Sequence, residues 1–473
     1  MIDIVYICIY DTSMSKTIIE EAKHIPVYGA YDVVVVGGGL TGVMAAISAR
    51  EDGASTVLIE SKPFLGGVGT MGLPLQGFYD VDFNKIIKGL PEKFIDNLNQ
   101  LGGVSEFIKC EMHNPFAIIN PETVKLVCQE MLLENNVDVL LHTIAADVQK
   151  TDNRITGIFI ENKSGRQLIE GKVFIDCSGD GDIAYRGGAP FVMGRELDHN
   201  TQASTLMFRL DNVNIQKLTE MVLENPNEYD LPEILPRIQF TYNKLHILVG
   251  LKNRIRKAQE DGIKNIPWDR VCYITCLDNN AVYINMVHVD GKDATTGDGL
   301  TEIEMKSRSQ ISLIHKVLKT YIPGFEHSIF TQSAAWAGIR ETRHILGDYI
   351  LSIEDIEQGK MPASSIVVGG YPIDIHYASQ KEQYEKLDFK KIKAYGIPYG
   401  CFLPRNIKNL LVAGRCISGT HQAMASARVM GTCMGMGQAV GVAAALAIAK
   451  NCEPRDLEVE HVRQGIRDLG GYI

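Results

Sequence analysis

A glycine-rich turn between two buried strands is the feature that most constrains the fold of this 473-residue chain. Residues 31–36 form an apolar, β-branched run that is typical of a central parallel strand. The run leads directly into Gly-Gly-Gly-Leu-Thr-Gly at residues 37–42, and a helix-compatible stretch follows at residues 43–50. A second strand at residues 56–60 ends in Glu60. This order of strand, glycine turn, helix, strand and acid predicts a βαβ unit that binds a dinucleotide.

The glycines and the acid have distinct physical roles in such a unit. Gly37 permits the tight turn, Gly39 lets the backbone approach a pyrophosphate, and Gly42 lets the helix pack close to the strand. The helix N-terminus offers N–H groups and a partial positive charge to the phosphates. The carboxylate of Glu60 can accept hydrogen bonds from the ribose hydroxyls.

A second glycine-rich loop indicates FAD as the dinucleotide. Residues 61–70 read Ser-Lys-Pro-Phe-Leu-Gly-Gly-Val-Gly-Thr, and residues 174–182 read Phe-Ile-Asp-Cys-Ser-Gly-Asp-Gly-Asp. Both segments resemble parts of the FAD site in flavoproteins of the glutathione-reductase-like superfamily. Residues 410–418 and 426–433 resemble the closing flavin-binding segment of the FAD-dependent oxidoreductase family. That family is allied to the fumarate reductase and succinate dehydrogenase flavoproteins and to heterodisulfide-reductase flavin subunits.

The resemblance implies an α/β fold in which a Rossmann-like FAD-binding domain is interrupted by an inserted α+β substrate or cap domain. The FAD-binding domain would have a parallel central sheet and an antiparallel crossover meander. The predicted segments are a lead-in at 1–29, the first FAD-binding part at 30–189, the cap at 190–329 and the second FAD-binding part at 330–473. The predicted meander strands are 138–142, 144–149, 155–161 and 166–170, the predicted cap strands are 204–210 and 281–289, and the predicted helices are 84–100, 121–135, 251–261 and 300–321.

The same resemblance assigns FAD contacts along the chain. It implies that Arg428, Thr432, Cys433 and Met434 lie at the isoalloxazine and that the backbone of Ala145 contacts the adenine. The predicted FAD-binding residues are Gly37, Gly39, Leu40, Thr41, Gly42, Glu60, Ser61, Lys62, Gly66, Gly67, Thr70, Ala145, Ser178, Gly179, Asp180, Gly414, Arg415, Arg428, Thr432, Cys433 and Met434.

Two departures from the family pattern affect these assignments. Many relatives carry Gly-Asp where this chain has Gly414 and Arg415, so the ribityl contact at these residues stays open. The fumarate and succinate enzymes attach FAD through a histidine just after the second glycine loop, and residues 69–72 contain none. We therefore expect the FAD to be non-covalent.

The composition and charge of the chain argue against some classes of binding partner. A net charge of −10 and a pI near 5.7 argue against nucleic acid or an anionic membrane. The ten cysteines include no C-x-x-C pair, which disfavours iron–sulfur ligation and structural zinc, so no metal is expected. They are scattered along the chain, which fits a reducing compartment and predicts a cytoplasmic location. The apolar residues 435–449 predict a buried core helix whose glycines allow close packing, rather than a membrane span. Met14 is an alternative start to Met1.

One arginine-rich segment supplies candidates for catalysis. Residues 337–349 bring Arg340, Arg343 and His344 within five positions, and arginine can bind a carboxylate through two parallel hydrogen bonds. The segment also resembles a G-I-R-E-T-R block of the family. The alternative interpretation is a structural network that involves Glu341.

Three further residues complete the predicted catalytic set. His376 follows an aspartate at position 374 on the same side of an extended chain, and His421 follows the strand that should reach the flavin. Arg428 and a helix N-terminus would stabilise reduced flavin. Ordinary structural hydrogen bonds are the alternative for each. For Cys433, a thiolate or a redox pair with Cys416 is open beside simple packing against the ring.

These observations favour an oxidoreductase that transfers a hydride between flavin N5 and a small anionic or carbonyl-bearing substrate. A flavin monooxygenase or oxidase is one alternative. A flavin subunit that passes electrons to a partner protein is another. As partners, a second copy of this chain and a redox partner protein both stay possible, beside the small-molecule substrate.

Overall fold

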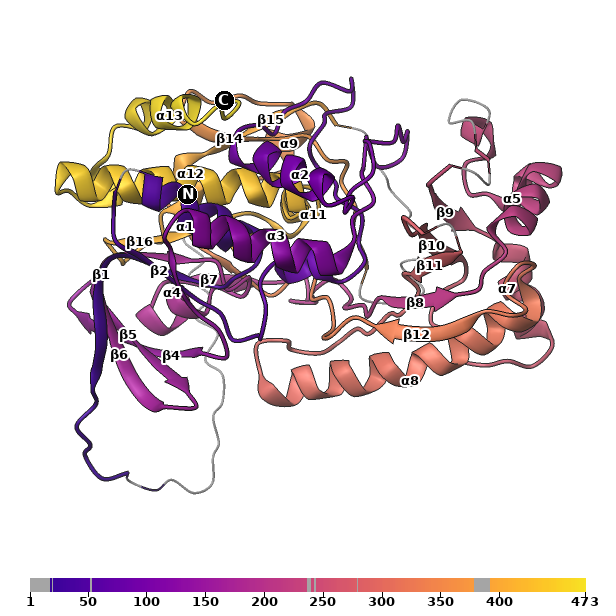
Figure 1. The fold of residues 1–473 in the computed structure, drawn as a ribbon, viewed down its shortest axis with the longest axis horizontal. Coiled ribbons are helices and arrows are strands. Elements are labelled where there is room, and N and C mark those ends of the chain that lie inside the picture. Colours follow the sequence, from indigo (N-terminus) through magenta and orange to yellow (C-terminus); the bar gives the residue numbers. More distant parts are fainter. Residues whose placement is uncertain are drawn as a thin grey trace.

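The computed structural model describes residues 18, 20–51, 53–235, 240–241, 244–278, 280–377 and 392–473. Both candidate start methionines lie outside the described residues. Figure 1 shows a larger body that contains the C-terminus and a smaller body beside it. The four-segment division of the sequence stays a prediction.

The larger body is built on a seven-stranded mixed sheet with the order β3-β2-β1-β6-β5-β4, in which β16 also pairs with β6. β1, β2, β3, β6 and β16 pair in parallel, whereas β6, β5 and β4 pair antiparallel. Residues 33–36 are buried, as a central parallel strand requires. The predicted α/β fold is therefore confirmed. The strands are β1 (Val27–Val36), β2 (Thr56–Ile59), β3 (Asp138–Leu140), β4 (Ile144–Thr151), β5 (Arg154–Asn162), β6 (Gly165–Asp176) and β16 (Leu410–Val412).

Two of the predicted strand assignments in this sheet are wrong. The strand predicted at 138–142 is not part of the meander, because β3 pairs in parallel with β2. The strand predicted at 166–170 is part of a longer strand, β6, which continues to Asp176 and pairs with β1 over most of its length. Gly171 does not interrupt β6, because its missing side chain leaves room for Phe174 and Val34, each of which would lie 2.8 Å from an added Cβ.

Helices cover the larger sheet, and Figure 1 shows α1, α3 and α12 on one side of it. α3 begins at Pro121 as predicted, and Asn120 caps it, since its side chain accepts hydrogen bonds from the N–H groups of Glu122 and Thr123. The helix predicted over 84–100 begins only at Leu90, with Pro91 in its first turn. The helices and remaining short strands of this body are α1 (Leu40–Glu51), α2 (Leu90–Gln100), α3 (Pro121–Glu134), α4 (Asp182–Gly187), β7 (Phe191–Met193), β13 (Arg343–Ile345), α9 (Ile353–Glu357), β14 (Ser365–Gly369), β15 (Tyr395–Pro398), α11 (His421–Ala427), α12 (Met430–Lys450) and α13 (Val459–Asp468).

The long apolar helix α12 packs directly against α1 through its glycines. A Cβ on Gly437 would lie 2.1 Å from the carbonyl oxygen of Thr41, and one on Gly441 would lie 2.4 Å from that of Ala45. By length and composition α12 is the one described helix that could cross a membrane, yet most of it is buried in this fold. The prediction of a core helix with closely packed glycines is confirmed.

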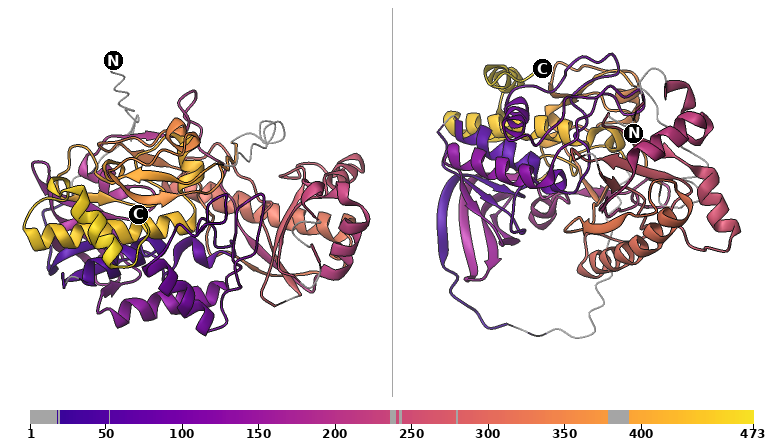
Figure 2. Two further views of the ribbon diagram at one scale, coloured as in Figure 1. Left: turned by 90° about the horizontal axis from the view of Figure 1, so that it is seen from above. Right: turned by 45° about the vertical axis from the view of Figure 1, so that its right-hand side comes forward.

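The smaller body contains a five-stranded antiparallel sheet with the order β12-β8-β11-β10-β9. It has its own apolar core, which includes Phe208, Tyr273 and Phe325. The long helix α8 runs beside β12 in Figure 1, and Figure 2 shows the second sheet and its helices flanking the larger body. The elements are β8 (Phe208–Asp211), α5 (Ile215–Glu224), β9 (Ile247–Gly250), α7 (Lys252–Glu260), β10 (Val271–Thr275), β11 (Ala281–Ile284), α8 (Gly297–Tyr321) and β12 (Ile329–Ser333).

Candidate cofactor and substrate site

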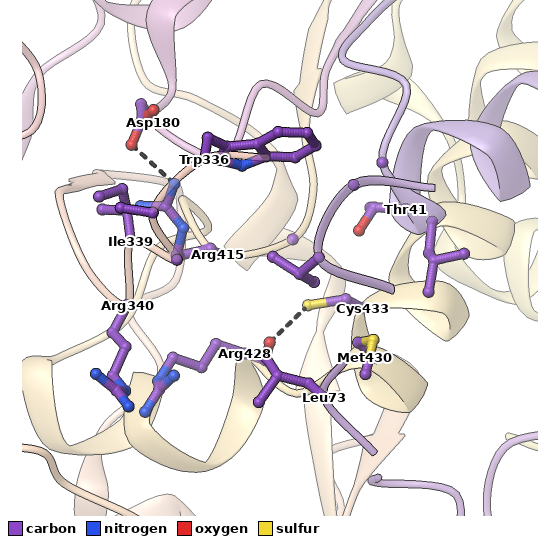
Figure 3. A pocket seen from close by; sticks show the side chains of 18 of the residues that line it. Thr41, Leu73, Asp180, Trp336, Ile339, Arg340, Arg415, Arg428, Met430 and Cys433 are labelled. Atoms are coloured by element: carbon purple, nitrogen blue, oxygen red, sulfur yellow. Dashed lines mark hydrogen bonds and ion pairs between the residues drawn. The ribbon is translucent and has the colours of Figure 1, made fainter. Parts of the chain in front are cut away.

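A cavity of about 870 Å³ extends from the larger sheet to the second sheet. Val36, Ile59 and Cys177 line it at or just beyond the carboxyl ends of β1, β2 and β6. Ligands of open α/β sheets bind at this edge. Residues from the first glycine turn, the C-terminal segment and the second sheet therefore face one common space. Figure 3 shows Thr41 of the glycine turn and Cys433 of the C-terminal segment at this cavity.

The first glycine turn has the shape that a pyrophosphate requires. Gly37 has φ +104°, and an added Cβ would lie 2.3 Å from the carbonyl oxygen of Cys177. An added Cβ on Gly42 would lie 1.8 Å from the carbonyl oxygen of Gly37. Gly39, by contrast, faces the cavity, and its nearest neighbour would be the Cα of Gly67 at 3.9 Å. The space at Gly39 is thus open to a ligand, and the first-turn N–H groups of α1 at Leu40 and Thr41 border it.

The second glycine loop docks on the first. The N–H of Gly66 donates to the carbonyl oxygen of Gly38 at 2.9 Å, and Gly67 lines the cavity. Gly66 and Thr70 do not line it. Thr70 instead donates from its hydroxyl to the carbonyl oxygen of Gly67 at 2.7 Å, so it stabilises the loop from the side that faces away from the cavity.

Glu60 marks the end of the cavity that would receive the adenosine. Its carboxylate accepts hydrogen bonds from the N–H of Gly38 at 2.6 Å and from the N–H of Lys62 at 2.8 Å. Ser61, Lys62 and Ala145 line the same end. Open glycine backbone, free helix N–H groups and a positioned acid together fit the predicted cofactor.

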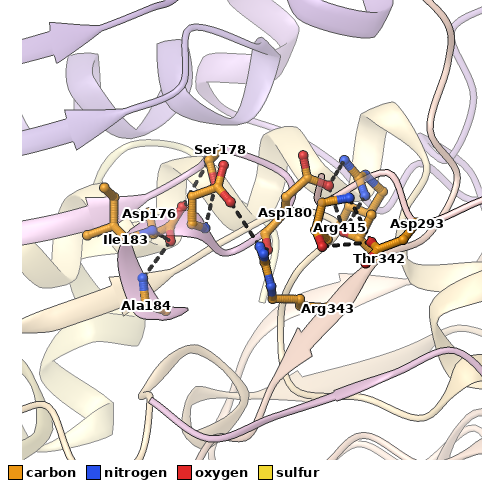
Figure 4. A network of polar contacts seen from close by, with 11 residues as sticks. Asp176, Ser178, Asp180, Ile183, Ala184, Asp293, Thr342, Arg343 and Arg415 are labelled. Atoms are coloured by element: carbon orange, nitrogen blue, oxygen red, sulfur yellow. Dashed lines mark hydrogen bonds and ion pairs between the residues drawn. The ribbon is translucent and has the colours of Figure 1, made fainter. Parts of the chain in front are cut away.

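A buried aspartate, which the sequence analysis did not include in the site, shapes the turn that follows β6. Asp176 accepts from the N–H groups of Ser178, Ile183 and Ala184 at 2.8–3.0 Å (Figure 4). Asp176 is the first residue of the 176–182 block, the part of the 174–182 segment that carries Ser178, Gly179 and Asp180. These three residues line the cavity. The block itself was therefore the signal that could have identified it.

Arg415 takes up an ion pair within the site. It lies 2.8 Å from Asp180, and Thr342 donates to the same carboxylate at 2.6 Å (Figures 3 and 4). Gly414, Arg415 and Asp180 all line the cavity. The cationic side chain that replaces the usual aspartate is thus neutralised by an acid from the neighbouring turn.

The start of α12 supplies the far wall of the cavity. Cys433 lines it, whereas Thr432 and Met434 are fully buried behind it and do not. Burial raises the pKa of the Cys433 thiol to about 12, and the thiol donates to the carbonyl oxygen of Arg428 at 3.3 Å. Burial also raises the pKa of Cys416, which does not line the cavity. The idea of a thiolate at Cys433 is corrected accordingly: both thiols are protonated at neutral pH.

Arg340, Asp374, His376 and Arg428 gather in one part of the cavity. Figure 3 shows the guanidinium groups of Arg340 and Arg428 near each other, and each interacts electrostatically with His376. Arg340 donates to the carbonyl oxygen of Ala203 at 2.6 Å. Arg428 donates to the side chain of Gln202 at 3.1 Å and to the carbonyl oxygen of Asp374 at 3.2 Å.

The cluster carries a net positive charge. Among the described residues, no carboxylate lies within ion-pair distance of Arg340 or Arg428, and Nε of Arg428 has no hydrogen-bond partner. The imidazole of His376 lies 3.3 Å from Asp374. Burial and the nearby Arg340 lower the pKa of His376 to about 4, so this imidazole is neutral at pH 7. Burial alone would raise the pKa of Asp374, but His376 and Arg428 lower it. One carboxylate thus faces two guanidinium groups.

Three predicted catalytic residues lie outside the cavity. Arg343 contacts Asp182 at 2.9 Å and stacks on the ring of Tyr185. His344 and His421 both contact the carboxylate of Glu341, at 3.1 and 2.8 Å. The contacts of Arg343 and His344 are therefore those of a structural network, which was the alternative interpretation of the 337–349 segment.

Sequence analysis missed several residues that line the cavity. Trp268 and Trp336, the two tryptophans of the chain, both do so, and Trp336 stacks on Phe64 with ring centroids 5.6 Å apart. Asp374 was noted only as a neighbour of His376. No sequence signal identified Gln202, which does not line the cavity but whose side chain accepts from both Arg428 and the N–H of His376.

Fold and cavity together define a dinucleotide-binding flavoprotein. A family model described as FAD dependent oxidoreductase matches residues 32–466, and the chain belongs to this family. It is an oxidoreductase with FAD as its cofactor. Among the described residues, no group of three or more metal-ligating side chains occurs.

The chain is also similar to several solved flavoproteins. They include a geranylgeranyl bacteriochlorophyll reductase-like protein from Thermoplasma acidophilum (13% identity, 93% of this chain and 82% of that chain, TM-score 0.47), a flavin-dependent brominase (13%, 93% and 83%, 0.47) and p-nitrophenol 4-monooxygenase from Pseudomonas putida DLL-E4 (9%, 93% and 85%, 0.44). At TM-scores below 0.5, these likenesses say nothing about the reaction of this chain.

Proposed function

We propose that this protein transfers a hydride between its FAD and a small organic anion. The observation that supports this proposal is the pair of guanidinium groups, Arg340 and Arg428, held in the cavity by carbonyl and amide oxygens. Such a pair can hold a carboxylate in a fixed orientation. FAD, when bound, supplies the hydride acceptor or donor.

The remaining groups of the cluster have separate roles in this proposal. His376 is neutral at pH 7 and can exchange a proton with a substrate at its ring, while the ionised Asp374 orients it. Gln202 holds Arg428 and the backbone of His376 in one arrangement. Arg343, His344 and His421 are positioning residues here and do not contact the substrate.

The cofactor is held by the glycine turns, Glu60 and the 176–182 block without a covalent bond in this proposal. Denaturation of the yellow holoprotein should release all of its FAD into the protein-free filtrate, because no histidine lies in residues 69–72. Absorbance of the filtrate and mass spectrometry of the chain measure this. A chain that keeps the mass of FAD would contradict it.

Arg340→Gln should keep FAD bound and lower kcat/KM for the true substrate by roughly 100-fold, since a charge-assisted hydrogen bond contributes about 1.5–3 kcal/mol. Arg467→Gln is the matched control, because Arg467 pairs with Glu460 on the exposed face of α13. The substrate is found by anaerobic reduction or reoxidation of the flavin with a panel of metabolites. Equal activity of both variants would rule out this placement of the anion.

The same panel separates the alternatives. A monooxygenase or oxidase would consume oxygen rapidly once its flavin is reduced. An electron-transfer subunit would leave every metabolite unchanged and copurify with a redox partner protein. A homo-oligomer is compatible with each of these.

A further inference from the structure

The wall of the cavity that faces the second sheet is apolar and regular. β9 and β10 pair antiparallel, with Val249 opposite Cys272 and Ile247 opposite Ile274. Side chains two residues apart on a strand share one face, and directly opposed residues share it too. These four residues therefore form one patch, and all four line the cavity together with Trp268.

This apolar patch lies next to the arginine pair. Arg340 and Asp374 both interact electrostatically with Cys272, which belongs to the patch. Thr205 connects the two walls, because its backbone exchanges two hydrogen bonds with Gly338, two residues before Arg340, at 2.7 and 3.1 Å. Its hydroxyl also donates to Asn285 on the side of the second sheet at 3.0 Å. A molecule held by Arg340 would thus have the patch within reach of its other end.

The charges are distributed unevenly between the two walls. The cationic groups, Arg340 and Arg428, lie on segments of the larger body, and the patch contributes no charged side chain. A second anionic group on the substrate would be desolvated against the patch without a partner, which is costly. An aliphatic or aromatic body would instead remove apolar surface from water.

We propose that the substrate is an amphiphilic monocarboxylate, with its carboxylate at Arg340 and Arg428 and its apolar body on the patch of Ile247, Val249, Cys272 and Ile274. This inference rests on the proposed function and adds the chemistry of the uncharged end. It excludes small dicarboxylates, which two arginines alone would not.

Equilibrium binding of three probes to the oxidised holoprotein tests the proposal. Acetate, hexanoate and adipate share the carboxylate and differ in the tail, and perturbation of flavin absorbance together with tryptophan fluorescence reports binding without turnover. Hexanoate should bind about 10- to 100-fold more tightly than acetate, given the methylenes it adds. Adipate, as long as hexanoate but with a second charge, should bind at least about tenfold more weakly than hexanoate.

Variants test the carboxylate end and the apolar end of the probes separately. Val249→Thr, and independently Ile274→Val, should reduce the preference for hexanoate while leaving acetate binding unchanged. Val192→Thr makes the first of these changes at an exposed position of β7, outside the cavity, and should leave all three affinities unchanged. Arg340→Gln should weaken all three probes.

The outcomes distinguish this inference from the proposed function. Equal affinities for acetate and hexanoate, with binding still dependent on Arg340, would overturn the apolar subsite and leave the anion site intact. Tighter binding of adipate than of hexanoate would do the same. Binding that is saturable for none of the probes, or independent of Arg340, would overturn both.

Discussion

Gly42→Ala is expected to yield a destabilised protein that retains little FAD. An added Cβ would lie 1.8 Å from the carbonyl oxygen of Gly37, which is backbone and cannot rotate away. Either α1 or the glycine turn has to shift, at a cost of about 3 kcal/mol or more. Thermal unfolding and the ratio of FAD to protein after gel filtration measure the two effects. A variant with the stability and FAD content of the wild type would show that α1 does not pack here as described.

Gly39→Ala is the informative companion to this variant. Its Cβ would meet nothing closer than 3.9 Å, so the apoprotein should keep its stability. The methyl group would, however, occupy the space through which the backbone approaches the pyrophosphate, and FAD affinity should fall about 10-fold to 100-fold. Gly297→Ala, which adds its methyl in open space at the start of α8, should change neither property. Unchanged FAD affinity in Gly39→Ala would place the cofactor elsewhere.

Glu341→Ala is expected to lower the free energy of unfolding by about 3–5 kcal/mol, the usual cost of removing one partner from a buried ionic group. Glu341 is 2% exposed and accepts from His421 at 2.8 Å and from the N–H of Gln202 at 2.8 Å, with His344 at 3.1 Å. Its loss would leave these donors without an acceptor. Because Gln202 holds Arg428, turnover should fall as well, whereas the FAD content should not.

The pH dependence isolates the charge of Glu341. Burial opposes ionisation, but the imidazoles of His344 and His421, which contact this carboxyl, lower its pKa to about 2. A lowered carboxyl pKa stabilises the folded state above the ordinary value of about 4.5, and this contribution is lost as the pH falls toward 2. The stability difference between wild type and Glu341→Gln should therefore shrink between pH 5 and pH 2. Glu460→Gln, on the exposed surface of α13, should leave the stability nearly unchanged at any pH, because solvent screens its ion pair.

Local patterns predicted the elements whose causes are local. The start of α3 at Pro121 and the glycine turn at 37–42 depend on residues a few positions apart, and both were predicted correctly. β3 was misassigned because a three-residue strand carries no signal of its partner, and its pairing with β2 is set by residues about 80 positions away. The start of α2 was misplaced because Asp80 accepts from the N–H of Asn84, which holds residues 80–84 in a turn.

The site shows the same division. The predicted FAD-binding residues that directly follow β1, β2, β6 and β16 line the cavity, since the fold itself brings them to the edge of the sheet. Thr432 and Met434 lie within α12 and do not line it. Arg340 and Arg343 could not be told apart by sequence, because only the packing of β13 against β7 turns Arg343 toward Asp182. The contributions of Trp268 and Gln202 arise from the second sheet and its connection, and no short pattern predicts such long-range contacts.

The packing of α12 on α1 has a consequence for biosynthesis. α1 is completed at residue 51, but the glycine-lined surface that covers it begins at residue 430. On the ribosome, the apolar face of α1 therefore stays without its partner while almost 380 further residues are translated. Contacts of such sequence separation form late and expose apolar surface meanwhile. Nascent chains that stall before α12 emerges should bind chaperones strongly, and full-length chains should be released from them.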